Sequence, residues 1–331
     1  MRNFNSISAT RTNGHGEPNR IALLLSGHDN GNGMGDDIHA LPAIAQRAQL
    51  GCSIDVFTRK FRLPLFNHPA WSNIGVRAFA GEELGVGSTP MLQGRYGAIY
   101  SLTQWCLIHD AATGGNVVVD RFDQFASLID TFAPQRFSFP SYIAAPDMTA
   151  NTSSGVVVAL TASGFKRSIP TREGRNLIRG IIREELPKER MLNLGLPQHG
   201  GELLPTWGAI VNAVASARVV VSVDTGVLAL ALALNRPTIA IFGPTTPRIV
   251  VQQFARYTDG FSPTVLQPNR HKVSDRSGCQ FPCNFQSARG YGEGNTCKHR
   301  GYGSECLRRI TTDTDFLATF RSELHRQYQR G

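Results

Sequence analysis

The chain has 331 residues, enough for one large domain or two ordinary ones with buried cores. Hydrophobic residues make up 41% and charged residues 18%, and no apolar run approaches the roughly 20 residues of a membrane-spanning helix, which indicates a globular protein. The net charge of +9 favours anionic partners such as nucleotide diphosphates, phosphorylated glycans or acidic lipid surfaces. The sequence contains no nucleic-acid-binding module, so nucleic acid is not expected as a partner.

Residues 1–20 are rich in Ser, Asn, Gly and Pro, and we expect them to form a flexible arm. They lack the apolar segment of a secretory signal, so the expected location is cytoplasmic. The folded part begins with a buried strand at Ile21–Leu25. A glycine-rich turn, Ser26–Asp36, then leads into a helix over Ile38–Gln49.

Strands continue to alternate with helical segments through the first half, which implies a parallel sheet. The further strands predicted here are Ser53–Phe57, Val76–Phe79, Ala98–Leu102 and Val117–Val119. The stretch Ala144–Ser154 has Pro, Ser, Thr and Asn without periodicity, and we expect it to be a linker.

The same alternation restarts after the linker and predicts a second domain. Its predicted strands are Gly155–Leu160, Val219–Val223 and Thr238–Phe242, and its helices are Arg172–Leu186, Trp207–Ala217, Val227–Leu234 and Thr312–Tyr328. The fold class is therefore α/β with two doubly wound domains. We expect an arm over 1–20, a first domain over 21–148, a second over 149–311 and a C-terminal helix over 312–331.

Asp224, Thr225 and Gly226 stand where a buried strand ends and a helix begins. Ligands of open α/β sheets collect at the carboxyl ends of strands, where helix N-termini offer N–H groups to anions. The next strand ends at Gly243-Pro244-Thr245, so the two loops are expected to flank one crevice, the outline of a sugar-nucleotide pocket. The alternative is that Asp224 only caps its helix.

Two more loops follow strands and carry suitable chemistry. Gly35 lets the backbone approach a ligand closely, and Asp36 beside it could act as a general base toward a hydroxyl; a helix cap by Asp36 or Asp37 is the alternative. Thr161, Lys166 and Arg167 combine a hydroxyl with two cations, which suits a diphosphate. A solvated basic loop is the alternative for this second segment.

A cysteine-containing segment over 279–306 is the fourth candidate. Four thiolates, those of Cys279, Cys283, Cys297 and Cys306, could hold zinc. Their spacing lacks the usual C-x2-C pairs, and buried free thiols remain the alternative. Disulfides are disfavoured in a reducing cytosol.

Taken in chain order, these segments resemble those of glycosyltransferase family 9, the bacterial lipopolysaccharide heptosyltransferases. The segments that carry the resemblance are Gly35–Pro42 (GDDIHALP), Val223–Gly226 (VDTG), Gly243–Thr245 (GPT) and Cys306-Leu307. The resemblance runs from about Ile21 to the C-terminus. It implies the GT-B fold, in which two Rossmann-like domains face each other across a cleft.

The resemblance also implies an inverting transfer that needs no metal and no cofactor at the reaction centre. The donor is a nucleotide-diphosphate sugar, with ADP-heptose among the candidates, and the acceptor is a glycan or glycolipid of the lipopolysaccharide type. The second domain holds the donor and the first mainly the acceptor. A basic enzyme of this kind fits a cytoplasmic location, including peripheral contact with the acidic inner face of the cytoplasmic membrane.

The resemblance assigns a role to each matching residue. Asp36 matches the base that deprotonates the acceptor hydroxyl, with Gly35 and His39 in the acceptor-side loop. Asp224 is implied to contact the donor sugar. The residues implied to bind the rest of the donor are Thr161, Lys166 or Arg167, the N–H groups of Thr225 and Gly226, Gly243 and Thr245. Positive charge there offsets the negative charge that builds on the leaving diphosphate.

Four positions differ from the family pattern, Ile169 and Thr246 among them. Ala229 stands where the family usually has a histidine three residues after the glycine of Asp-Thr-Gly, and Asp37 takes the place of a usual apolar residue beside the base. Two alternative functions therefore stay open. One is a catalytically degenerate protein that binds sugar nucleotides or serves as a scaffold, and the other is a sugar-nucleotide epimerase or hydrolase on the same fold.

Overall fold

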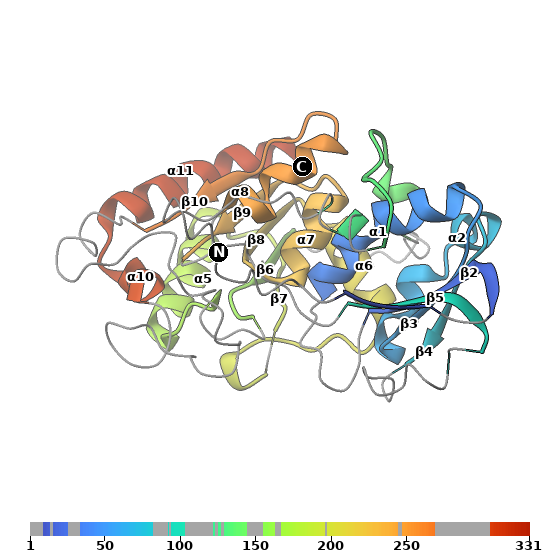
Figure 1. Cartoon of the computed structure of the whole chain (residues 1–331). Helices are drawn as coiled ribbons and strands as arrows, with labels where there is room; N and C mark the ends of the chain where they lie inside the picture. Colours follow the sequence, from blue (N-terminus) through green and yellow to red (C-terminus); the bar gives the residue numbers. More distant parts are fainter. Residues whose placement is uncertain are drawn as a thin grey trace, which may run out of the picture. The chain divides into compact units, whose positions relative to one another are not determined.

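A computed structural model describes most of the chain: residues 9–13, 16–25, 34–81, 92, 94–102, 122, 125–126, 129–143, 155–162, 167–195, 197–243, 247–268 and 305–331. The chain forms two compact units (Figure 1). The first unit comprises Met1–Ile108, Val117–Ala145 and Thr206–Gly208, and the second comprises His109–Asn116, Pro146–Pro205 and Ala209–Gly331. The change of unit after Ala145 falls in the segment predicted as a linker, which lies outside the described residues.

The first unit is built on a sheet with the strand order β1-β5-β2-β3-β4. Its strands are β1 (Ala9–Asn13), β2 (Glu17–Leu24), β3 (Ser53–Thr58), β4 (Val76–Ala80) and β5 (Tyr96–Leu102). The helices described in it are α1 (Met34–Gln49), α2 (Pro69–Asn73) and the 3-10 helices η1 (Lys60–Phe66) and η3 (Phe139–Ser141). All strands run parallel except β1, and the strand order reverses between β2 and β5.

Two boundaries in this unit differ from the sequence prediction. Ala9–Asn13 forms β1, antiparallel to β5, so a flexible arm over residues 1–20 is wrong for this segment and for the start of β2 at Glu17. Backbone pairing with the edge of β5 outweighs the polar composition of the segment. Helix α1 begins at Met34 rather than at Ile38, which places Gly35 and Asp36 in its first turn.

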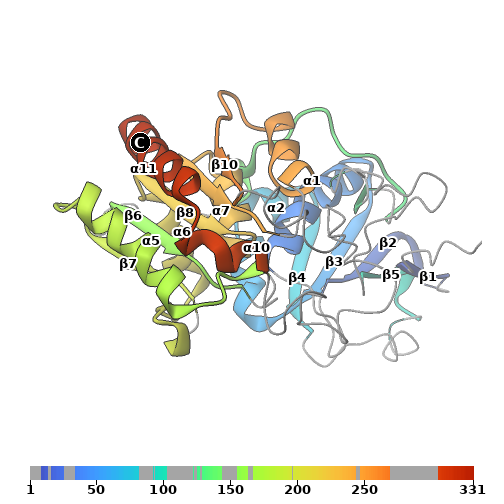
Figure 2. The ribbon, with the colours of Figure 1, turned by 90° about the vertical axis from the view of Figure 1, so that its left-hand side faces the viewer.

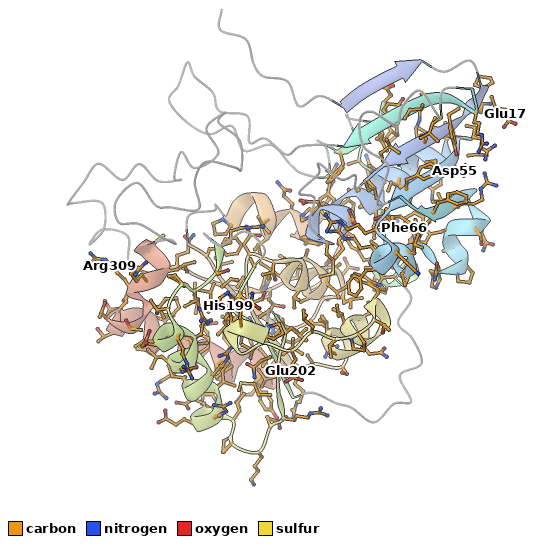
Figure 3. All side chains as sticks on the ribbon, turned by 90° about the horizontal axis from the view of Figure 1, so that it is seen from below. Glu17, Asp55, Phe66, His199, Glu202 and Arg309 are labelled. Carbon is orange, nitrogen blue, oxygen red and sulfur yellow. The ribbon has the colours of Figure 1, made fainter. Side chains whose placement is uncertain are left out.

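A buried carboxylate links the strands of the first unit on the sheet face opposite α1. Asp55 of β3, labelled in Figure 3, is 1% exposed. It accepts hydrogen bonds from Arg20 Nη2 (2.8 Å), Arg77 Nε (2.9 Å) and Tyr96 Oη (2.8 Å). The three donors come from β2, β4 and β5. Burial, together with the hydrogen bond to Asp55, raises the pKa of Tyr96 to about 12. Asp55 is thus satisfied by two cations and a hydroxyl.

The second unit is built on a fully parallel sheet with the order β10-β9-β8-β6-β7. Its strands are β6 (Val156–Ala159), β7 (Met191–Asn193), β8 (Val219–Val223), β9 (Thr238–Ile241) and β10 (Thr264–Leu266). Its helices are α5 (Arg172–Glu185), α6 (Trp207–Ala215, which begins with residues of the first unit), α7 (Gly226–Ala233), α8 (Pro247–Val250), α10 (Glu305–Arg308) and α11 (Thr314–Arg330), with the 3-10 helices η5 (Pro197–His199), η6 (Gln252–Arg256) and η8 (Arg309–Thr311). The strand order reverses between β6 and β8.

The core of the second unit follows from the alternation of its valine-rich strands. Alternate residues of β6 and β8, including Val158 and Val221, pack with Ile178 of α5 and Phe320 of α11 in one cluster. Figure 2 shows the ribbons of α5 and α11 on the same side of this sheet. The intervening residues, such as Val220, are also buried, so both faces of the sheet are covered. Short strands β7 and β10 have three residues each, too few to show a sequence period. Within the described part of the chain, no helix has the length and apolarity to cross a bilayer.

Candidate functional site

The strand order of the second unit places two predicted site residues at one edge of its sheet. β6 and β8 are adjacent and parallel, so the segments that follow them begin at the same edge, at the point where the strand order reverses. Arg167 follows β6 and Asp224 follows β8. Arg167 Nη1 lies 3.6 Å from Asp224 Oδ2, a charge contact longer than a hydrogen bond.

Asp224 is placed to accept hydrogen bonds from a ligand. Its side chain is 7% exposed, and Oδ2 has no hydrogen-bond partner among the residues that the structure describes. A buried carboxylate oxygen without a donor is unusual and costly, and donors from a bound molecule would satisfy it. The hydroxyl groups of a sugar are such donors.

The alternative interpretation of the sequence, that Asp224 caps helix α7, is wrong. Thr225 is the N-cap: its Oγ1 accepts a hydrogen bond from the backbone N–H of Leu228 at 3.2 Å and lies 2.9 Å from Ser222 Oγ. Because Thr225 satisfies this part of the helix terminus, the carboxylate of Asp224 remains available at the edge of the sheet.

Thr161 follows β6 and Gly243 follows β9, the two strands that flank β8, so both lie at the same sheet edge. Gly195, which follows β7, has φ +145°, and a Cβ added to it would come within 2.5 Å of Thr161 Oγ1. Only glycine therefore allows this close approach of the chain to Thr161. Gly243 is buried just after β9. The predicted donor residues Lys166 and Thr245 lie outside the described residues.

A buried arginine that the sequence analysis missed shapes the segment carrying Arg167. Arg175 of α5 is 6% exposed, and its Nη1 donates hydrogen bonds to the carbonyl oxygens of Ile169 (2.8 Å) and Pro170 (3.1 Å). Ser168 Oγ also accepts a hydrogen bond from the N–H of Ala162 at 2.7 Å. Burial lowers the pKa of Arg175. In the sequence it was simply one polar residue of an amphipathic helix, without any motif to mark it.

In the first unit, the predicted base Asp36 lies in the helix that follows β2, a strand at the reversal of the strand order, where ligands of such sheets usually bind. Helix α1 follows β2, one of the two strands at the reversal, and Asp36 is half-buried in its first turn. His39 is fully buried, with its ring centroid 5.2 Å from that of Phe122 and Nδ1 2.6 Å from the carbonyl oxygen of Gly35. His39 is therefore a packed core residue, and its predicted place in an acceptor-side loop is corrected.

Asp37 forms a buried ion pair beside Asp36. Arg62 Nη1 donates to Asp37 Oδ2 at 3.0 Å, and Thr58 Oγ1 lies 3.5 Å from the same oxygen. The side chains of Asp37 and Arg62 are 1% and 9% exposed. Burial outweighs the attraction of Arg62 and raises the pKa of Asp37 from 3.8 to about 6. The sequence showed Asp37 as a departure but gave no sign of its partner.

Two further sequence predictions concern Ala229 and the cysteines. Ala229 is 1% exposed within α7, so a side chain at this position lies inside the unit. Cys306 is half-buried, and Cys279, Cys283 and Cys297 lie outside the described residues. In the part of the chain with described structure, no group of three or more His, Cys, Asp or Glu residues could hold a metal ion.

The raised pKa of Asp37 predicts how pH changes stability. The native state takes up this proton at about pH 6 and the unfolded chain near 3.8, so the carboxyl group stabilises the fold below 3.8 and loses that contribution as pH rises through about 6. Lowering the pH from about 7.5 to about 5 should therefore raise the unfolding free energy of the natural protein relative to Asp37→Asn, which has no proton to bind. Urea denaturation at each pH measures this difference, and identical pH slopes for the two proteins would contradict it.

The comparisons with known proteins agree with this architecture. Residues 202–275, which include β8, Asp224, α7 and β9, match the family model described as glycosyltransferase family 9 (heptosyltransferase). No curated protein matches the sequence.

Two solved structures share the fold. The dodecameric iron-containing heptosyltransferase TibC of enterotoxigenic E. coli, in complex with ADP-D-beta-D-heptose, is 14% identical with a TM-score of 0.59, over 95% of this chain and 78% of that one. The E. coli ADP-heptose lps heptosyltransferase II is 13% identical with a TM-score of 0.52, over 94% of this chain and 99% of that one. The predicted GT-B fold is thus confirmed. The match to the family 9 model covers residues 202–275, so the similarity in sequence to these glycosyltransferases is shown for that part of the second unit.

Proposed function

We propose that the chain transfers a sugar, with inversion, from a nucleotide-diphosphate donor such as ADP-heptose to a glycan or glycolipid acceptor of the lipopolysaccharide type. The observation that carries the proposal is the contact of Arg167 with Asp224 where the strand order of the second unit reverses. The names of TibC and of heptosyltransferase II, both of which have this fold, support ADP-heptose as the donor.

Arg167 and Asp224 have separate tasks in this proposal. The guanidinium of Arg167 binds the diphosphate and stabilises the negative charge that develops on it as the glycosidic bond breaks. Asp224 accepts hydrogen bonds from hydroxyl groups of the donor sugar, through the oxygen that is unsatisfied among the described residues. The N–H groups of Thr225 and Gly226, at the start of α7, face the phosphates. Thr161, Gly243, Lys166 and Thr245 complete the donor site.

Asp36 is the base that removes the proton from the acceptor hydroxyl. It is half-buried, whereas its neighbour Asp37 is buried and paired with Arg62, so Asp36 is the carboxylate of this turn that an acceptor can reach. The acceptor is held mainly by the first unit, in which Gly35 leaves space for it. We also place the reaction in the cytoplasm, at the inner face of the membrane where an anionic glycolipid acceptor meets a basic protein.

Replacing Arg167 with alanine should weaken donor binding by about 1.5–3 kcal/mol, the net worth of a charge-assisted hydrogen bond, or roughly 10- to 150-fold in Kd. Calorimetric titration with ADP-heptose and with ADP measures the effect. Lys188→Ala provides a control, because it removes an exposed positive charge that follows the C-terminal end of α5. Equal affinities for the natural protein and Arg167→Ala would show that the diphosphate binds elsewhere.

Asp36→Asn should abolish transfer and leave donor affinity nearly unchanged, because the donor is held by the other unit. The test measures release of ADP from ADP-heptose with a truncated lipopolysaccharide as acceptor, beside the donor Kd of the same variant. A degenerate binding protein, the alternative that Ala229 favours, would bind the donor without releasing ADP at all. An epimerase or hydrolase would consume the donor in the absence of an acceptor.

Transfer should need no metal at the reaction centre, since cationic side chains supply the positive charge. Dialysis against EDTA should leave both the rate and the melting temperature unchanged, and added Mg²⁺ should not raise the rate. A rate lost to EDTA and restored by Mg²⁺, at an unchanged melting temperature, would contradict this. Iron or zinc held by the four cysteines, which elemental analysis would detect, is a separate question because one relative is named as iron-containing.

A further inference from the structure

Asp37 and Arg62 join three elements of the first unit at the base of α1. Asp37 belongs to the first turn of α1, Arg62 to η1, and Thr58 is the last residue of β3. The carboxylate of Asp37 meets both partners through one oxygen, at 3.0 Å and 3.5 Å. This contact fastens the start of the helix to the carboxyl end of a strand.

The first unit contains a second buried carboxylate, Asp55 of β3, whose partners differ from those of Asp37. Asp55 is as buried as Asp37 but accepts from two arginines and a tyrosine. Asp37 has one cationic partner, and its pKa is raised to about 6, so keeping it ionised at neutral pH costs stability. The three partners of Asp55 account for its burial as part of the structural framework. Asp37, with one cationic partner, holds the start of α1 at a cost in the free energy of unfolding.

Asp37 is next to the proposed base, Asp36, in the first turn of α1, and this position suggests why the cost in stability is tolerated. Successive residues of an α-helix point about 100° apart, so fixing the side chain of Asp37 also fixes the direction of its neighbour Asp36. The burial of the two side chains shows the division: Asp37 faces Arg62 and the sheet, and Asp36 is half-buried. A base displaced by about 1 Å can lose up to 100-fold in rate.

We propose that Asp37 is a positioning residue for the base: its ionised carboxylate, held by Arg62, fixes the first turn of α1 and so the direction in which Asp36 meets the acceptor. This inference rests on the proposed function of Asp36. The charged groups that face Asp37 are Arg62 from η1 and Asp36 from α1, with Thr58 of β3 as the neutral third. Protonation of Asp37 relieves the cost of burying its charge and so stabilises the fold, but it also removes the charge that attracts Arg62, so in acid this contact no longer fixes the direction of the turn.

The experiment compares the natural protein with Asp37→Asn and Arg62→Met, with Asp55→Asn as the matched control for loss of a buried, arginine-paired carboxylate. The first measurement is kcat for ADP release, as a function of pH, with ADP-heptose and truncated lipopolysaccharide. We expect kcat of the natural protein to fall as pH drops through about 6. In Asp37→Asn this limb should be absent and kcat lower by about 10- to 100-fold at neutral pH, with the donor KM unchanged.

Arg62→Met should show the same loss of kcat, and Arg62→Lys, which keeps the charge, should recover part of it. Asp55→Asn should lower the melting temperature and keep the acid limb of the natural protein. If the single variants do not fold, Asp37→Asn with Arg62→Met removes both charges of the pair and serves in their place. A natural pH profile and kcat in folded Asp37→Asn overturn the inference.

Amide hydrogen exchange of the first turn of α1 provides a second measurement, which needs no donor or acceptor. Protection of residues 36–39 should fall in Arg62→Met and stay natural in Asp55→Asn; unchanged protection in Arg62→Met also overturns the inference. The proposed function fails separately, if Asp36→Asn retains transfer or the natural protein shows none. If Asp36→Asn is inactive while the Asp37 and Arg62 variants behave like the natural protein, only the positioning role is lost.

Discussion

The parallel pairing of β6 with β8 is the constraint on which the candidate donor site depends. Residues that follow these strands are far apart in the sequence, yet the pairing of Ala159 with Ser222 brings the two chain segments to one sheet edge. The strand order reverses between β6 and β8, and at such a reversal the helices that follow the two strands diverge and leave room for a ligand at the sheet edge. This topology brings Arg167 and Asp224 close together. Arg175 then holds the segment after β6 through its hydrogen bond to a backbone carbonyl, and Thr225 holds the segment after β8 as the N-cap of α7.

Each unit has a buried carboxylate near the carboxyl end of a strand, Asp224 after β8 and Asp37 beside Thr58 of β3, but the two charges are balanced differently. Asp224 faces an arginine at 3.6 Å, too far for a hydrogen bond and close enough for attraction, so a ligand can displace the contact at little cost. Arg62 Nη1 and Asp37 Oδ2 lie 3.0 Å apart and both side chains are nearly excluded from water, so separating them would leave a buried charge without a partner. The first arrangement suits exchange with a ligand, and the second suits a fixed framework.

Much of this architecture could be predicted from the sequence, for physical reasons that particular elements illustrate. The run Val219–Val223 is apolar throughout because β8 is buried on both faces, and the amphipathic period of α5 reflects its packing on one side of the sheet. β1 was missed because its pairing with β5 uses backbone groups, which leave no trace in side-chain pattern. Motif residues Asp36 and Asp224 could be found in this way, since strand ends are visible in a sequence.

The pairing of side chains could not be predicted. Arg62 lies in a basic, aromatic segment with no motif, and only the fold brings it to Asp37. His39 belongs to the motif, and the resemblance implies an acceptor-side role for it, but its ring packs against Phe122, a contact between residues distant in the sequence. A motif records which residues recur together and does not say which of them face the ligand and which hold the others in place. In GDDIHALP the structure separates these roles: Asp36 is the accessible carboxylate, and Asp37 and His39 are buried residues beside it.

The burial of Ala229 bears on the same distinction in the second unit. Helix α7 is buried from Leu228 to Ala233, so an imidazole at position 229 would have to fit among packed side chains, and alanine suits this helix as a small apolar residue. In the proposed function, recognition of the donor then depends more heavily on Arg167 and Asp224. For a diphosphate sugar, the cation after β6 offers positive charge to the diphosphate, and the carboxylate at the end of β8, which does not cap α7, offers acceptors to the sugar hydroxyls; neither interaction needs the imidazole.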